Sequence, residues 1–537
     1  MSIARNFLIL LLAAGTLVAN PKKEKAAPKA SEKDSMLVES NFSAMKLRSI
    51  GPAITSGRIS DIAVHPRCNS TFYVAVSSGG VWKTTNSGIS FSPIFDSENS
   101  YSTACVVIDE KNPHVVWVGT GENNSQRSVA WGDGVYRSTD DGASWKRMGL
   151  EKSEHIGKII IDPRNSNVVW VAAQGPLWAD GGDRGLYKTT NGGETWELVL
   201  AVSPMTGVTD VALDPRNPDV AYAATYQRRR HVWALINGGP ESSIHKTTDG
   251  GKTWTKIDRG LPTSDMGKIG IAVAPANPDI IYATIEAAGG MGGTFRSTNC
   301  GASWEKRSSW VSGSAQYYQE IICDPHNADC FYAVDTYLQY TTDGGKTMHG
   351  VSNRYRHVDY HAVWIDPNNS SHIMIGGDGG LYESFDKGEK FRFFENLPVT
   401  QFYRVASDNA EPFYNVYGGT QDNATWGGPS QTINSGGITN EDWFTVVGGD
   451  GYEPQIDPVD PNIVYGQWQY GNVVRYDRRS GESFYIQPQP KKGETLRWNW
   501  DTPLLISPHQ HTRLYIAANK VFRSDDRGQS WQEISPD

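Results

Sequence analysis

The chain has 537 residues and a formal net charge of −9, and 20% of its residues are charged. The first 34 residues carry six basic and three acidic groups, so the remainder stands near −12, which argues against nucleic acid as a partner. With 55 glycines, 18 tryptophans and 24 tyrosines, the composition favours a turn-rich, aromatic-packed β protein over a helical or disordered chain.

Residues 1–19 have the pattern of a cleavable signal peptide, because Arg5 precedes the apolar run Phe7–Ala19. Residues 20–40 are rich in Lys and Ala and are expected to form a solvated linker. No later run approaches the roughly 20 apolar residues of a spanning helix. The sequence therefore predicts a secreted or periplasmic protein with no membrane span after signal removal, and an uncleaved anchor is the alternative.

The octapeptide Ser138-Thr-Asp-Asp-Gly-Ala-Ser-Trp145 is one of eight copies of the pattern Ser/Thr-x-Asp/Asn-x-Gly-x-x-aromatic, of which the copy at Thr341 ends in Met348. The Asp or Asn side chain is expected to accept backbone N–H groups, and Gly supplies the positive φ of a tight turn. We therefore interpret the third position of each copy as structural. These positions are Asn86, Asp140, Asn191, Asp249, Asn299, Asp343, Asp386 and Asp526.

Most copies follow a β-branched run, an Asp-Pro-x-Asn turn and a second apolar run, as in Lys158–Asn165 and Val168–Ala172. With one strand entering the octapeptide and one leaving it, each unit is a four-stranded antiparallel meander. Steps of 43 to 58 residues, and a final step of 140 that holds two further units, give ten repeats over residues 41–537. The predicted fold is an all-β propeller, either one ten-bladed ring or a seven-bladed ring plus part of a second.

The connections between the second and third strands are long in repeats two to four, at Gly119–Gly134, Gln174–Gly185 and Tyr226–Ser243. Insertions on one rim of a propeller mark a binding face, where aromatic rings stack on sugars or anchor a peptide; the alternative is that large loops pack their aromatics on one another. The run of three arginines at 228–230 is either a solvated loop tip or a receptor for an anionic group. The ligand-binding candidates on this rim are Glu122, Arg127, Trp131, Asp133, Trp178, Asp180, Tyr226, Arg229 and Trp233.

Three further acidic residues lie in glycine-rich or amide-rich turns outside the octapeptides. Asp378 and Asp450 are candidates for ligand binding or for tight turns, and Asp422 is the candidate for catalysis. The separation of two such carboxyl groups would distinguish inverting from retaining glycoside hydrolysis.

The five cysteines show no spacing typical of a metal site, and the sequence predicts neither a metal nor a cofactor. Cys323 and Cys330 flank a predicted turn between two strands, so they either form a disulfide across a hairpin or remain free thiols.

The octapeptides resemble the Asp-box, or bacterial neuraminidase repeat, sequences of sialidases, family 74 xyloglucan hydrolases, sortilin-type sorting receptors and photosystem assembly factors. The phrases Gly80–Thr85, Asp162–Asn165 and Gly379–Tyr382 are most similar to those of large secreted bacterial proteins of the sortilin-like or glycosyl hydrolase-like type. The family 74 resemblance implies one catalytic Asp early in the chain and another later. Ser78 occupies the early position, and Asp422 is the candidate for the later one.

These observations lead to three hypotheses. The first is a sortilin-like binding module that holds a polypeptide or polysaccharide on the loop-rich rim. The second is a xyloglucanase-type hydrolase of β-glucan, which Ser78 argues against because a serine cannot replace a carboxylate as general base. The third is an assembly scaffold. Whether the protein is an enzyme is left open at this stage.

Overall fold

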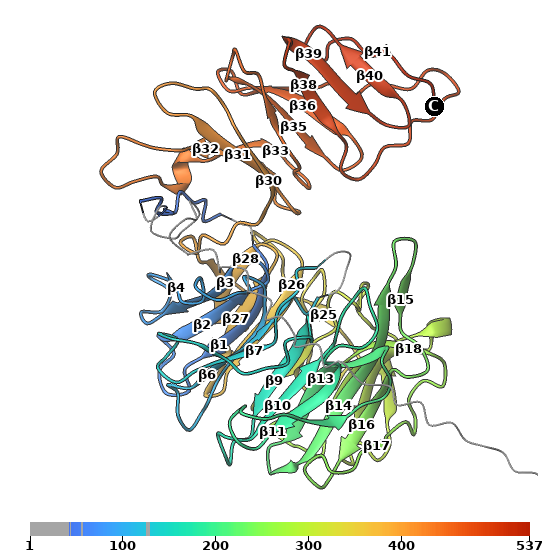
Figure 1. The fold of residues 1–537 in the computed structure, drawn as a ribbon. Coiled ribbons are helices and arrows are strands. Elements are labelled where there is room, and N and C mark those ends of the chain that lie inside the picture. The colour runs from blue at the N-terminus through green and yellow to red at the C-terminus, as the bar shows by residue number, and fades with distance from the viewer. Residues whose placement is uncertain (1–41, 43, 55–56, 125–128) are drawn as a thin grey trace, which may run out of the picture. The chain divides into compact units, whose positions relative to one another are not determined.

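The computed structural model describes residues 42, 44–54, 57–124 and 129–537. The predicted signal peptide and linker lie outside these residues, as does Arg127. Residues 50–537 form one compact unit, built of ten antiparallel sheets and two short 3-10 helices, η2 (Ala288–Gly290) and η3 (Asn440–Asp442). The predicted all-β fold of ten repeats is confirmed (Figure 1). Among the described residues, no helix is long and apolar enough to cross a membrane.

Each of the first seven blades is a meander whose strands pair in chain order. Their bounds are β1 (Ile59–Val64), β2 (Phe72–Val76), β3 (Gly80–Thr84) and β4 (Ser92–Pro93); β5 (Thr103–Ile108), β6 (Val116–Thr120), β7 (Val135–Ser138) and β8 (Lys146–Arg147); β9 (Ile156–Ile161), β10 (Val169–Ala173), β11 (Gly185–Thr189) and β12 (Glu197–Leu200); β13 (Thr206–Asp214), β14 (Asn217–Arg230), β16 (Ser243–Thr247) and β17 (Thr255–Lys256), with β15 (Leu235–Asn237) paired to the end of β14; β18 (Met266–Val273), β19 (Ile281–Ala287), β20 (Gly293–Ser297) and β21 (Glu305–Ser308); β22 (Ile321–Cys323), β23 (Phe331–Ala333), β24 (Gln339–Thr341) and β25 (His349–Gly350); and β26 (Tyr360–Asp366), β27 (Asn369–Gly377), β28 (Gly380–Ser384) and β29 (Arg392–Phe393).

The last three blades repeat the same plan. Their bounds are β30 (Phe402–Ser407), β31 (Asn415–Thr420), β32 (Thr425–Pro429) and β33 (Phe444–Val447); β34 (Gln455–Ile456), β35 (Ile463–Trp468), β36 (Asn472–Asp477) and β37 (Glu482–Tyr485); and β38 (Leu504–Ser507), β39 (Gln510–Ala517), β40 (Val521–Ser524) and β41 (Gln532–Glu533).

The second strands of the first three blades are buried on both sides, which explains why they are continuous apolar runs rather than alternating ones. All five residues of β10 are buried. Val169 and Val171 pack into the cluster shared with the preceding blade, whereas Trp170 and Ala172 pack into the cluster shared with the following blade. Alternate side chains of one strand therefore join two blade interfaces.

The eight octapeptides form the turns between third and fourth strands, and their hydrogen bonds repeat in every copy. The side chain at the third position accepts a hydrogen bond from the N–H of the residue four positions after it; for example, Ser144 N–H donates to Asp140 Oδ1 (2.9 Å). The hydroxyl at the first position likewise accepts from the N–H of the residue four positions after it; for example, Gly142 N–H donates to Ser138 Oγ (2.8 Å). Three of the tryptophans also reach the preceding blade, as where Trp145 donates to Ile94 O (2.7 Å). These turns therefore tie neighbouring blades together.

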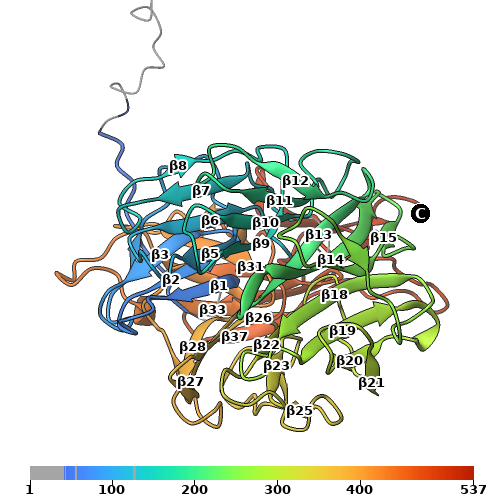
Figure 2. The same ribbon diagram turned by 90° about the horizontal axis from the view of Figure 1, so that it is seen from below.

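The first seven blades close into a ring. Strand β1 lies beside β26 and β27, and an apolar cluster spans the seam between the first and seventh blades (Figures 1 and 2). Within it Phe72, Phe91 and Phe394 pack edge to face, with ring centroids 5.8 to 6.0 Å apart. Of the two arrangements that the sequence allows, the seven-bladed ring plus part of a second is present, and the ten-bladed ring is wrong.

Blades eight to ten pack in sequence through the apolar clusters around Val464 and Leu514. A buried carboxylate joins the last two of them, because Arg527 donates to Asp457 (3.0 Å) and His511 Nδ1 lies 2.8 Å from the same side chain.

The predicted pairing of Cys323 with Cys330 is not present, since both are free thiols. Cys323 lies opposite Phe331 in the hairpin, and the N–H of Asp324 donates to Cys330 O (2.9 Å). Adjacent residues of a strand point to opposite faces of the sheet, so the two thiols face away from each other.

The ring seam gives a prediction about stability. Phe394→Ala should lower the free energy of unfolding by about 3–5 kcal/mol, because it leaves a cavity between the first and last blades of the ring. Chemical denaturation followed by tryptophan fluorescence measures the change. Ile89→Ala, which removes a side chain that is 78% exposed at the same seam, is the control. Equal effects of the two substitutions would contradict the assigned seam.

Candidate functional site

One end of the ring gathers charged side chains from several blades around the inner strands. Arg58 precedes β1, Glu122 follows β6, Asp359 precedes β26 and Asp378 follows β27. This end carries the connections between second and third strands. We call the set the crown site, and its members are Arg58, Glu122, Tyr317, Tyr318, Asp359, His361, Asp378 and Asp422.

Arg58 is the buried centre of the crown site. Its Nε donates to Asp378 Oδ1 (2.7 Å), its second terminal nitrogen donates to Asp378 Oδ2 (3.2 Å), and its first donates to Glu122. The guanidinium also lies over the ring of Tyr317, 4.8 Å from the centroid. One cation thereby joins the second and seventh blades to the segment that enters the first.

The Asp378 carboxylate is fully engaged by its neighbours. Tyr317 OH donates to Oδ2 (2.8 Å), and His361 Nε2 lies 2.8 Å from Oδ1. Burial alone would raise the pKa of Asp378, but Arg58 and His361 outweigh it and hold that pKa well below its usual range. Burial lowers the pKa of His361, whereas Asp378 opposes that shift.

Asp359 has the opposite electrostatic environment. Burial, together with the negative charges of Asp378 and Asp422, raises its pKa to about 6. Tyr318 OH donates to Asp359 Oδ1 and lowers that pKa in part. The Tyr318 ring is itself stacked on His361, with centroids 5.3 Å apart, which fixes the hydroxyl in place.

Ser78, Asp378 and Asp422 occupy equivalent turns between the second and third strands of blades one, seven and eight. In each turn an aromatic residue lies four positions after the Ser or Asp, and its side chain donates to the backbone carbonyl of the residue that directly follows the Ser or Asp. The donor and acceptor pairs are Trp82 and Gly79 (2.9 Å), Tyr382 and Gly379 (3.3 Å), and Trp426 and Asn423 (2.5 Å). Asp422 therefore stands at the repeat position that Ser78 fills in the first blade.

Asp422 lies beside the carboxylates of the seventh blade. Asn423 Nδ2 donates to Asp378 O (3.2 Å), and the N–H of Asp422 donates to Asp450 Oδ1 (2.9 Å). Oxygens of Asp359, Asp378 and Asp422 all lie within 4.8 Å of one another. Asp359 (φ 69°) and Asp422 (φ 58°) both have left-handed backbones, a conformation that is strained for non-glycine residues and gathers at functional sites.

These three carboxylates are the candidate ligands for a cation among the described residues. Asp378, however, already binds Arg58, Tyr317 and His361. Asp359 accepts from Tyr318 through Oδ1 and Asp422 from Gln421 through Oδ2, so each keeps one oxygen without a hydrogen-bond donor among the described residues. A raised pKa on one member of such a pair suits proton transfer.

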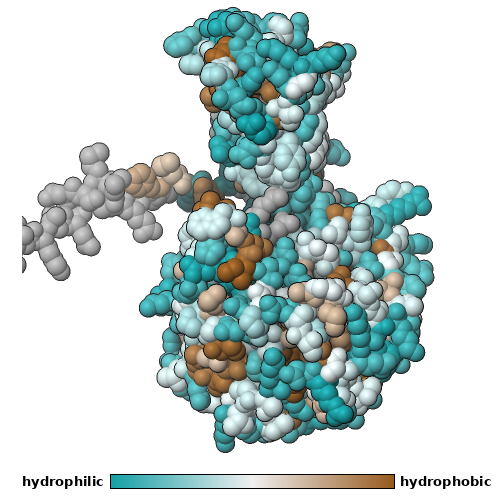
Figure 3. All heavy atoms as spheres, turned by 90° about the vertical axis from the view of Figure 1, so that its right-hand side faces the viewer, coloured by the Kyte–Doolittle hydropathy of each residue, from teal (hydrophilic) through white to brown (hydrophobic). Residues whose placement is uncertain are grey.

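Of the ligand-binding candidates on the rim, only Glu122 belongs to the crown site. Trp131 is 73% exposed, and it follows Ala130, whose carbonyl accepts the N–H of Glu122 (3.0 Å). Trp178 and Trp233 are exposed on the neighbouring connections. The view in Figure 3 shows apolar residues gathered in small patches among polar ones.

Several rim candidates have structural partners instead. Tyr226 is buried, with its hydroxyl donating to Asn237, so its prediction as a surface contact is wrong. Asp133 accepts from Tyr136 OH (2.7 Å), and Asp180 pairs with Arg229. The run of arginines is not a loop tip, because residues 228–230 pair with β15.

Sequence reasoning missed Arg58, Tyr318, Asp359 and His361. None of them lies in a repeated motif, and each acts through a partner from another blade. The position of Asp359 directly before the first strand of its blade is the one usable signal.

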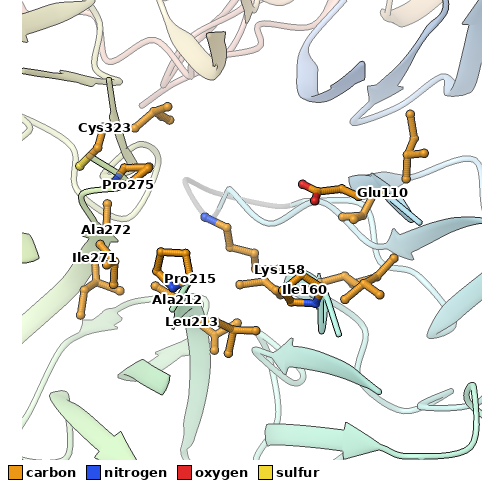
Figure 4. A pocket seen from close by; sticks show the side chains of 18 of the residues that line it. Glu110, Lys158, Ile160, Ala212, Leu213, Pro215, Ile271, Ala272, Pro275 and Cys323 are labelled. Atoms are coloured by element: carbon orange, nitrogen blue, oxygen red, sulfur yellow. The ribbon is translucent and has the colours of Figure 1, made fainter. Parts of the chain in front are cut away.

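A separate cavity of about 510 Å³ lies at the opposite end of the inner strands, next to the Asp-Pro turns (Figure 4). Ile160, Leu213 and Ile271 line it, with Lys158 and Glu110 as charged neighbours. The lining lacks aromatic rings, so it offers no stacking surface for sugars.

The sequence is similar to one protein-family model and to several known proteins. The sortilin family model (Sortilin-Vps10; neurotensin receptor 3) matches residues 133–263. A probable oligoxyloglucan-reducing end-specific xyloglucanase of Neosartorya fischeri is 26% identical over 526 residues, which cover 88% of this chain and 57% of that protein. A xyloglucanase of Hypocrea jecorina is 30% identical over 306 residues, which cover 52% of this chain and 33% of that protein. The chain thus spans little more than half of the first relative and a third of the second.

Two solved structures are similar in fold. The family 74 xyloglucanase of Xanthomonas campestris has a TM-score of 0.50 at 14% identity, covering 91% of this chain and 94% of that one. PorZ, a surface component of the type-IX secretion system of Porphyromonas gingivalis, has a TM-score of 0.50 at 13% identity, covering 91% and 60%. The chain is a β-propeller that is similar in fold to the family 74 xyloglucanase of Xanthomonas campestris, and its residues 133–263 match the sortilin family model.

Proposed function

We propose that the protein is a glycoside hydrolase that cleaves a β-glucan of the xyloglucan type at the crown site. The observation that carries the proposal is the pair Asp359 and Asp422, whose carboxyl oxygens lie within 4.8 Å of each other. This separation is close to the roughly 5–5.5 Å between the carboxyl groups of retaining glycoside hydrolases, and shorter than the roughly 6.5–9.5 Å of inverting ones. The xyloglucanase relatives support the choice of substrate.

Asp359 is the proposed general acid. Its pKa of about 6, raised by burial and by its acidic neighbours, keeps a proton available in weakly acidic solution. In the reaction Asp359 gives this proton to the glycosidic oxygen as the bond to the anomeric carbon breaks. Asp422 is exposed and takes the second role as the nucleophile, which bonds to the anomeric carbon as the leaving sugar departs. Water then hydrolyses this glycosyl-enzyme ester, with the deprotonated Asp359 taking the proton of the water.

Asp378 and Arg58 are positioning residues in this scheme. The negative charge of Asp378 helps to keep Asp359 protonated, and Arg58 holds Asp378 in place. Ser78 then needs no catalytic role, because Asp359 of the seventh blade and Asp422 of the eighth supply both carboxyl groups.

Binding without cleavage is the second candidate, and the exposed Trp131 and Trp233 favour it. Flat rings of this kind hold a polysaccharide whether or not it is cut. The N-terminal sequence supports a site of action outside the cytoplasm for either candidate.

Asp422→Asn tests the proposal directly. Reducing ends released from a panel containing xyloglucan, other β-glucans and cellulose should fall about 10²- to 10⁴-fold, because the nucleophile is lost. Asp140→Asn is the control, since Asn already occupies the equivalent octapeptide position at Asn86 and Asn191. Retention of a glycan without any release by the unmodified protein would support binding alone.

The pH dependence tests the role of Asp359. The acid must be protonated, so kcat/KM should decline as pH rises through about 6. Tyr318→Phe removes a hydrogen bond that favours the charged carboxylate, so the decline should move upward by roughly 0.5 to 1 pH unit. An unchanged or downward-shifted profile in Tyr318→Phe would argue against Asp359 as the acid.

Trp131→Ala tests the route of the substrate. Loss of a stacking ring that is 73% exposed should raise KM about three- to tenfold with little change in kcat, since a ring of this size contributes roughly 0.5–1.5 kcal/mol. Leu505→Ala, which removes a 59% exposed side chain from the tenth blade, should leave KM unchanged. Equal KM values for both variants would place the glycan elsewhere.

A further inference from the structure

Arg228 is a buried arginine whose guanidinium is not satisfied by the protein. It lies near the end of β14 and is 1% exposed. Its Nε and both terminal nitrogens have no hydrogen-bond partner among the described residues. A guanidinium carries five N–H donors and a permanent charge, so both its donors and its charge lack compensation.

Other buried arginines of the same ring show how the fold normally satisfies this group. Arg184, which is also buried, donates to Gln174 O (2.8 Å) and Ala179 O (3.0 Å), among other backbone carbonyls. Arg58 is held between two carboxylates. Arg228 differs from both, because its guanidinium forms no hydrogen bond with any of the described residues.

The charges around Arg228 do not replace the missing partners. Burial is the main cause that lowers the pKa of Arg228 to about 10; the like charge of Arg184 acts in the same direction, and Tyr226 and Glu154 oppose it in part. The side chain is therefore still protonated at neutral pH. Burial and the same two arginines lower the pKa of His155 to about 3, so His155 adds no charge. An unpaired buried cation costs several kcal/mol, which a bound counter-ion would offset.

We propose that Arg228 binds a small inorganic anion of the chloride type inside the fourth blade. A water molecule would meet the donors and leave the charge uncompensated, whereas a halide meets both. The site uses none of the crown-site residues, and its occupation stabilises the fold whether or not the protein cleaves a glycan.

Thermal unfolding in chloride and in gluconate at constant ionic strength tests the inference. The midpoint of the wild-type protein should rise with chloride concentration and then saturate, because a ligand that binds only the folded state stabilises it. Arg228→Met should lose this response. Arg479→Met, which removes an exposed arginine paired with Asp477, should keep it.

A direct measurement covers the case in which Arg228→Met does not fold. Wild-type crystals soaked in bromide should show one anomalous peak within about 3.5 Å of the Arg228 guanidinium. A water molecule at this position would overturn the inference. So would a bromide peak without any chloride dependence of thermal unfolding, because the bromide would then be an adventitious ion only.

Discussion

Each blade of the seven-bladed ring has two apolar faces, and both are covered by neighbouring blades. Strand β10 shows the constraint, since alternate side chains enter the interfaces on either side of it. Seven blades satisfy this requirement by closing, and Phe394 meets Phe72 and Phe91 at the seam. The remaining elements of the ring follow from this packing, including the octapeptide turns that tie one blade to the next.

Closure also concentrates charge. The inner strands of the ring converge, so residues at their ends approach one another from blades that are distant in sequence. Arg58 bridges 64 residues to Glu122 and 320 residues to Asp378. Because Arg58 keeps Asp378 ionised, the negative charge of Asp378 helps to raise the pKa of the neighbouring Asp359. The buried ion pair thus adds to the effect of burial, which is the largest cause of the raised pKa of Asp359.

The repeat pattern was sufficient to predict the fold class, the number of blades and the octapeptide turns, because these depend on local periodicity. It could not choose between ten blades and seven plus three, since closure depends on the contact between β1 and β26. Asp378 and Asp422 were found from their glycine-rich and amide-rich turns. Asp359 and Arg58 were missed because their roles come from partners on other blades, and Tyr226 was misplaced because a long connection continued as buried strand.

The central claim is that a glycosidic bond lies between Asp359 and Asp422. The most direct test is a crystal structure of the Asp359→Asn, Asp422→Asn double variant with a β-glucan oligosaccharide. The account predicts a sugar spanning the two carboxamides, with its glycosidic oxygen within hydrogen-bond distance of residue 359. An oligosaccharide bound only on the rim, away from both residues, would contradict it.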